Sequence, residues 1–95
     1  MTRPPWHGKV QMRLEPYAEY KYFDAMDDTP AGRKTRRLNL VNRNSGDIIG
    51  TVSWYASWRQ YCFFPEPNTV WSDGCLADVH DLMGKLRSER GHGNE

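Results

Sequence analysis

The stretch "TVSWYASWRQYCFFPEP", Thr51–Pro67, gives the strongest indication of the fold of this chain. It contains two tryptophans, two tyrosines and two phenylalanines in 17 residues, and aromatic residues favour β-strands. The small residues "AS" after Tyr55 mark a short turn, and Pro65 ends a strand because it lacks a backbone N–H. The pattern predicts two antiparallel strands, "DIIGTVSWY" at 47–55 and "WRQYCFFP" at 58–65.

A third strand precedes this pair. In "RRLNLVN", residues 36–42, Leu38 and Leu40 alternate with polar neighbours, which is the two-residue period of a half-buried strand. "RNSG", Arg43–Gly46, supplies residues for a tight hairpin. Gly50 indicates a bulge or a close backbone approach. Residues 36–65 are therefore predicted to form a three-stranded antiparallel meander.

A helix is predicted after the meander, over "CLADVHDLMGKLRSER" at 75–90. Leu76, Val79, Met83 and Leu86 recur at helical spacing and are expected to pack on the sheet. Ser72 or Asp73 is expected to cap the helix start, and Gly84 is expected to weaken the helix so that it frays beyond that point. The fold class is α+β, with the core at residues 36–88.

The first part of the chain gives a weaker pattern. "KVQMRLE" at 9–15 and "AEYKYFDAM" at 18–26 both read as strands, and Pro16 separates them. They predict an additional N-terminal hairpin that joins or caps the sheet. Residues 1–90 are expected to form one small domain, followed by a disordered tail at 91–95.

Composition excludes several classes of protein. No apolar run reaches the ~18 residues of a membrane helix, and no apolar stretch follows the N-terminus as in a secretory signal. A cytoplasmic location and no membrane partner are therefore expected. The chain has two cysteines, Cys62 and Cys75, without a CxxC pair, so we expect reduced thiols, no disulfide and no metal.

Catalytic constellations are also missing from the sequence. His80 follows Cys75 by five residues, which places the two on different sides of a helix. No glycine-rich phosphate loop is visible. We therefore expect neither an enzyme nor a cofactor.

The basic residues are unevenly placed, although the net charge is only +1. Between residues 33 and 46 there is no acidic residue, and all the charges are positive. Such a run is a candidate phosphate-binding edge of the sheet. An ordinary solvated loop and strand edge is the alternative. The residues concerned are Arg33, Lys34, Arg36, Arg37 and Arg43.

The aromatic strand suggests a second part of the same site. Alternation places Trp58 on one face of the strand and Arg59 and Tyr61 on the other. A single helix covers one face only, so some rings are expected to be exposed. Exposed rings beside arginine can stack on nucleic-acid bases, and Trp58, Arg59 and Tyr61 are the candidates. The alternative is that both faces are covered and the rings are only core.

The segment from Gly50 to Val79 resembles a family of small uncharacterised proteins of tailed phages and prophages. The motifs that carry the resemblance are G-T-x-x-W-Y, W-R-Q-Y-x-F-F-P and G-C-L-A-D, over about a third of the chain. The resemblance implies a phage origin and no particular activity.

Two functions from different classes are consistent with these features. The first is a non-catalytic protein that binds nucleic acid or a nucleotide through the basic strand edge and the aromatic sheet face. The second is an inhibitor or adaptor that binds a host protein, such as a defence protein, through exposed aromatic rings.

Overall fold

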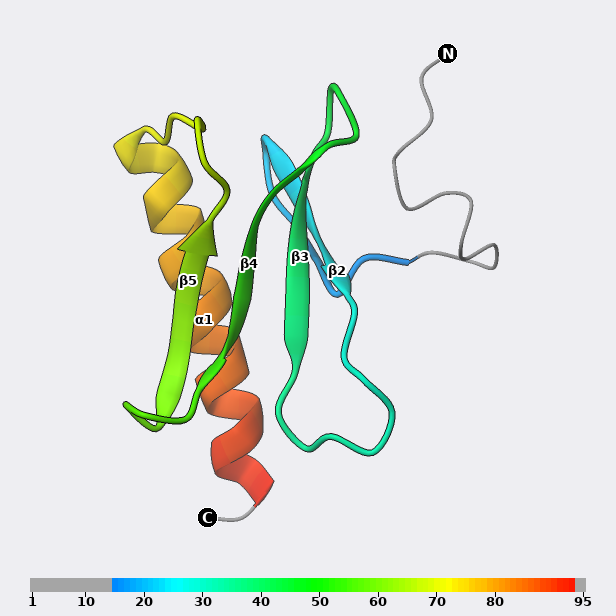
Figure 1. Ribbon diagram of the computed structural model, residues 1–95, viewed down its shortest axis with the longest axis vertical. Coiled ribbons are helices and arrows are strands. Elements are labelled where there is room, and N and C mark those ends of the chain that lie inside the picture. The colour runs from blue at the N-terminus through cyan, green and yellow to red at the C-terminus, as the bar shows by residue number, and fades with distance from the viewer. Residues whose placement is uncertain (1–14, 94–95) are drawn as a thin grey trace.

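The computed structural model describes the backbone of residues 15–93 and the side chains of residues 15–90. Its elements in chain order are β1 (Ala18–Glu19), β2 (Phe23–Asp27), β3 (Arg37–Asn42), β4 (Ile48–Tyr55), β5 (Gln60–Pro65) and α1 (Asp73–Gly93). The strands form one antiparallel sheet in the order β1-β2-β3-β4-β5. Helix α1 covers one face of this sheet (Figure 1).

The α+β class is confirmed, with one C-terminal helix packed on an antiparallel sheet. The sheet has five strands rather than three, because the predicted strand at 18–26 is folded into the hairpin of β1 and β2. The backbone N–H of Tyr20 donates to the carbonyl of Phe23 at 2.9 Å and closes this hairpin. The other predicted N-terminal strand, at 9–15, lies almost entirely outside the described residues.

The β3–β4 hairpin follows the predicted pattern. Leu38 and Leu40 are fully buried, and the side-chain oxygen of Asn42 accepts the backbone N–H groups of Asn44 and Ser45 inside the turn. Gly46 has a φ of 81°, which glycine adopts without steric cost. The register shifts between Leu40 and Val41, so the hairpin contains a β-bulge.

Gly50 marks a close approach between β4 and β5. A Cβ at this position would lie 2.7 Å from a ring carbon of Phe63, which is far inside van der Waals contact. The absence of a side chain on Gly50 therefore lets the Phe63 ring lie against the β4 backbone.

The β4–β5 turn is longer than predicted. Residues 56–59 form the turn, and β5 begins at Gln60 rather than at Trp58. Two backbone bonds, Trp58 N–H to Tyr55 O and Arg59 N–H to Ala56 O, both at 3.1 Å, define it. Arg59 has a φ of 54° in the left-handed region. Trp58 and Arg59 thus lie in the turn and not in a strand.

Helix α1 docks through a face that was only partly predicted. Val79, Leu82 and Leu86 are buried, and Met83 is half-buried against the core. Leu76 is 46% exposed, so its predicted core position is wrong. The buried residues centre the packed face about 90° away from Leu76 around the helix axis, at about 100° per residue.

Both ends of α1 are held by specific contacts. Ser72 Oγ accepts the backbone N–H of Cys75 at 3.1 Å and confirms the predicted cap. The helix continues to Gly93, beyond Gly84. Glu89 is hydrogen-bonded to Arg36, and the Arg90 guanidinium lies 4.2 Å from the centre of the Trp54 ring. These contacts attach the last turns of α1 to the sheet.

The start of the sheet is tied to α1 by a polar contact. The Tyr20 hydroxyl donates to Asp81 at 2.7 Å, and Lys85 donates to the same carboxylate at 2.8 Å. Burial, together with the hydrogen bond to Asp81, raises the pKa of Tyr20 to about 12. Tyr20 therefore stays a neutral donor at physiological pH and links the β1–β2 turn to the helix.

Candidate ligand-binding surface

The Arg36 side chain is bonded to two carboxylates and so has a structural role. Its Nε and Nη2 donate to the two carboxylate oxygens of Glu89 at 2.7 and 3.0 Å, and its Nη1 donates to Asp27. The guanidinium also lies 4.9 Å from the centre of the Tyr17 ring. Hydrogen bonding to Glu89 raises the pKa of Arg36 above its ordinary value. Arg36 thus joins β2, β3 and α1.

Arg37 and Arg43 also have acidic partners. Arg37 Nη2 lies 3.1 Å from a carboxylate oxygen of Asp28. Arg43 lies 3.6 Å from Asp24 and donates to the Tyr20 carbonyl at 2.9 Å. Arg43 follows β3, whereas Arg36 precedes it, so the strand separates them. The structure therefore does not bring Arg36, Arg37 and Arg43 to a single basic edge, and each of them has a carboxylate nearby. That these residues bind a ligand stays a prediction.

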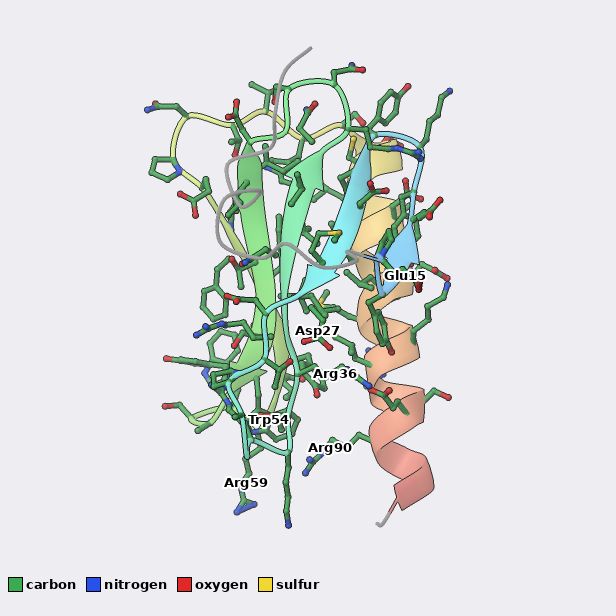
Figure 2. All side chains as sticks on the ribbon, turned by 90° about the vertical axis from the view of Figure 1, so that its right-hand side faces the viewer. Glu15, Asp27, Arg36, Trp54, Arg59 and Arg90 are labelled. Atoms are coloured by element: carbon green, nitrogen blue, oxygen red, sulfur yellow. The ribbon has the colours of Figure 1, made fainter. Side chains whose placement is uncertain are left out.

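Most of the cations without a carboxylate partner lie at one end of the molecule. In an antiparallel sheet, the β2–β3 loop and the β4–β5 turn lie at the same end, and the Glu89 and Arg90 contacts bring the end of α1 there as well. Figure 2 shows Arg36, Arg59 and Arg90 at this end, with Arg90 reaching from the helix toward the sheet. Six cations among residues 15–90 have no carboxylate partner. Lys21 lies in the β1–β2 turn and Arg87 lies one turn before Arg90 on α1. We call the other four, which lie in the β2–β3 loop, in the β4–β5 turn and at the end of α1, the basic end: Arg33, Lys34, Arg59 and Arg90.

The members of the basic end are held in different ways. Arg33 and Lys34 are exposed in the β2–β3 loop, and Arg33 Nε makes a 3.4 Å contact with Thr35 Oγ1. Arg59 is exposed in the left-handed position of the β4–β5 turn. Arg90 is positioned by the Trp54 ring beneath it. Three segments distant in sequence thus supply positive charge to one end.

A cleft opens within the basic end, between the β2–β3 loop and α1. Its volume is about 490 Å³. Charged side chains dominate its wall, and four of them are basic. It is lined by Thr29, Arg33, Lys34, Arg36, Tyr61, Glu89 and Arg90.

The predicted aromatic site is divided by the sheet. Tyr61 is 8% exposed and belongs to the core, so its prediction as an exposed stacking ring is wrong. It lies on the α1 side, next to Trp54 across the β4–β5 pair. Its hydroxyl accepts the backbone N–H of Arg36 at 3.1 Å and lines the cleft.

Trp58 is exposed, as expected, and it does not stand alone. It is 66% exposed in the turn, and its ring packs edge-on against the Tyr55 ring, with 5.1 Å between the ring centres. The Tyr55 ring also packs edge-on against the Phe64 ring, with 6.2 Å between the ring centres. Tyr55, Trp58 and Phe64, which we call the aromatic cluster, are all more than one-third exposed.

Two members of this surface were missed at the sequence level. Phe64 is not among the predicted site residues, although strand alternation puts it on one face of β5 with Gln60 and Cys62. Arg90 is not among them either. Its contact with Trp54 joins residues 36 positions apart, and no local signal predicts it.

The thiols and the acidic groups form no further site within the part of the chain that the structure describes. Cys62 and Cys75 are free and half-buried. Among the described residues, no group of three or more His, Cys, Asp or Glu side chains is arranged to hold a metal ion. No helix in the described region is long and apolar enough to cross a membrane.

Comparison with known proteins links the chain to phages. It is 27% identical over 59 residues to an "Uncharacterized 9.3 kDa protein" of Acholeplasma phage L2, and the match covers 62% of this chain and 76% of that protein. The chain is thus similar to a small phage protein. No protein-family model matches the sequence. No solved structure matches the chain.

Proposed function

We propose that this protein binds nucleic acid, with the basic end contacting phosphates and Trp58 stacking on a base. The observation that carries the proposal is the convergence of Arg33, Lys34, Arg59 and Arg90 from three separate segments. Their charges have no carboxylate partner among residues 15–90. Phosphate backbones are bound by such groups through the release of condensed counterions.

The position of Trp58 supports a single-stranded ligand. Trp58 precedes Arg59 in the same turn, so an exposed ring and an exposed guanidinium are neighbours. Single strands are held by basic grooves that follow the backbone and by aromatic rings that stack on the bases. Bases inside a duplex are already stacked and cannot use the ring. We therefore expect single-stranded oligonucleotides to bind more tightly than duplexes of the same length.

The backbone of Arg59 is consistent with a role for its side chain. Glycine or asparagine fits a φ of 54° better than arginine, for which the left-handed region is unfavourable. The turn therefore gains nothing in conformational energy from an arginine at this position. Charge exposed at the tip of the turn is what the residue contributes.

A protein partner is the second candidate, and the aromatic cluster favours it. Tyr55, Trp58 and Phe64 form a connected exposed apolar surface, and aromatic rings are enriched at protein interfaces. In this case the protein would be an inhibitor or adaptor acting on a host protein. Binding through these rings would weaken little with salt, whereas phosphate binding weakens steeply.

The test is a fluorescence-anisotropy titration of labelled 20-nucleotide single strands and duplexes at low salt. We expect binding tighter than millimolar, with preference for the single strand. Lys34→Glu should weaken it, whereas Lys21→Glu should not. The two variants change the net charge equally, and Lys21 lies in the β1–β2 turn at the opposite end of the sheet. Failure of both oligonucleotides to bind at millimolar concentration would overturn the proposal and leave the protein partner.

A further inference from the structure

We infer that the cleft between the β2–β3 loop and α1 binds a terminal phosphate, a phosphate monoester at the end of a nucleic-acid strand or on a free mononucleotide. The inference deepens the proposed function and rests on it for the nucleic-acid source of the phosphate. The cleft is distinct from the turn that carries Trp58 and Arg59, since neither residue lines it.

The charge of the cleft suits a dianion. Its wall contains three cations without a carboxylate partner, Arg33, Lys34 and Arg90. The fourth basic side chain, Arg36, is bonded to Glu89 and Asp27. A phosphate monoester carries a charge of about −1.5 to −2 at neutral pH, whereas a diester within a strand carries one negative charge. A site with this excess of positive charge therefore favours the end of a strand over its interior.

Two groups in the cleft have hydrogen atoms available for donation. Arginine has five N–H donors, and the observed bonds of Arg36 to Glu89 and Asp27 use three of them. The Tyr61 oxygen accepts the Arg36 backbone N–H at 3.1 Å. Its own proton has no acceptor among the hydrogen bonds of residues 15–90, and the cleft it lines offers a place for one.

These two donors are fixed before any ligand arrives. Arg36 is held by two carboxylates and by the Tyr17 ring. Tyr61 is held in the core against Trp54, at a ring separation of 5.3 Å. Arg33, Lys34 and Arg90 also line the cleft and have no carboxylate partner among residues 15–90. Fixed donors lower the ordering cost of binding, and these three cations supply the charge.

The test compares one single-stranded oligonucleotide with a 5′-phosphate, a 3′-phosphate or hydroxyl groups at both ends. We expect a phosphate at one of the two ends to tighten binding by roughly 10- to 100-fold, as charge-assisted hydrogen bonds would. Arg90→Gln should reduce this ratio. Arg59→Asn should lower all the affinities by the same factor, because Arg59 lies outside the cleft. Lys21→Gln should change neither quantity.

Tyr61→Phe removes the available proton and should also reduce the ratio. Its melting temperature must be measured, because the variant also loses the acceptor of the Arg36 N–H. Arg90→Gln keeps the test valid if Tyr61→Phe is not folded.

Separate titrations with adenosine 5′-monophosphate and with adenosine distinguish failure of the cleft inference from failure of the nucleic-acid proposal. If the oligonucleotides bind with equal affinity whatever their ends, the inference is wrong and the proposed function stands. If no oligonucleotide binds but the monophosphate binds at least about 10-fold more tightly than adenosine, the cleft site stands and the nucleic-acid proposal falls. If neither oligonucleotide nor monophosphate binds, both are wrong.

Discussion

Arg36 and Lys34 lie two residues apart in one basic run, yet the structure places them in different environments. Arg36 donates to Glu89 and Asp27 and holds the sheet and the helix together. Lys34 is exposed in the loop, with no carboxylate partner among residues 15–90. A run of basic residues in the sequence can therefore contain two kinds of cation. Some are paired with carboxylates that folding brings close, and the others are left to bind a ligand.

The largest expected effect comes from weakening the packing of α1, the helix that carries the Glu89 partner of Arg36. Leu86 is fully buried, and its helix carries Glu89 and Arg90. Leu86→Ala should lower the free energy of unfolding by about 2–5 kcal/mol, because it leaves a cavity in the core. Leu76→Ala is the matched control, with about 1 kcal/mol or less expected, because Leu76 is 46% exposed. Equal effects in urea denaturation would contradict the observed docking face.

The next effect separates the two kinds of cation directly. Arg36→Ala removes the partner of two carboxylates, and we expect a loss of roughly 1–3 kcal/mol of stability, reduced by the partial exposure of the pairs. Arg33→Ala should change stability by less than about 0.5 kcal/mol. Thermal denaturation of both variants measures the difference. A neutral Arg36→Ala would mean that the Glu89 and Asp27 bonds contribute nothing to stability.

A smaller effect is expected in the β4–β5 turn, where one substitution should keep or raise stability and lower affinity. Arg59→Asn places a residue that tolerates a positive φ in the turn, and we expect stability to be unchanged or higher by up to about 1 kcal/mol. Oligonucleotide affinity should fall at the same time. Denaturation and anisotropy on one preparation test both. A variant that is less stable yet binds as before would contradict the account of the turn.

The smallest effect concerns pH and compares two carboxylates of β2. Burial opposes ionisation of Asp27, but hydrogen bonds from Thr29 and the Arg36 charge outweigh it and hold the pKa of Asp27 below its ordinary value. Asp27 therefore stabilises the fold above its unfolded pKa of about 3.9, and this contribution is lost as the pH falls through the lower folded pKa.

The pKa of Asp24 is shifted in the opposite direction from that of Asp27. Burial raises its pKa although Arg43 opposes the shift, so its contribution is present below the unfolded pKa and is lost as the pH rises through the folded pKa. At pH 7, Asp27→Asn should destabilise and Asp24→Asn should not, with differences below about 1 kcal/mol because the side chains are partly exposed. Melting curves between pH 3 and pH 7 would show it. Destabilisation by Asp24→Asn alone would contradict the assignment.

The sequence predicted those parts of the fold that depend on local patterns. The alternation around Leu38 and Leu40 indicated β3, and the spacing of Val79 and Leu86 indicated α1. An N-terminal hairpin that joins the sheet was predicted, but the turn of the β1–β2 hairpin was missed, because Tyr20–Tyr22 contains no glycine, proline or asparagine. The start of β5 was misplaced for a similar reason, since an arginine occupies the left-handed position of its turn.

The candidate site was less predictable because pairing is non-local. Asp27 precedes Arg36 by nine residues, and Glu89 follows it by 53. Nothing in the basic run distinguishes Arg36 from Arg33 before these carboxylates are placed. Tyr61 shows the same limit. Alternation puts it on the face of β5 opposite Phe64, but only the docking of α1 determines that this face is buried.

If the unpaired cations of the basic end bind phosphates, they must contribute to the salt dependence of nucleic-acid binding. The association constant for a single-stranded oligonucleotide should be measured between 50 and 300 mM salt for the wild type, for Arg33→Gln/Lys34→Gln and for Lys21→Gln. The account predicts that the double variant has a shallower log–log slope by about 0.7 for each lost phosphate contact, while Lys21→Gln keeps the wild-type slope. An unchanged slope in the double variant would contradict the account.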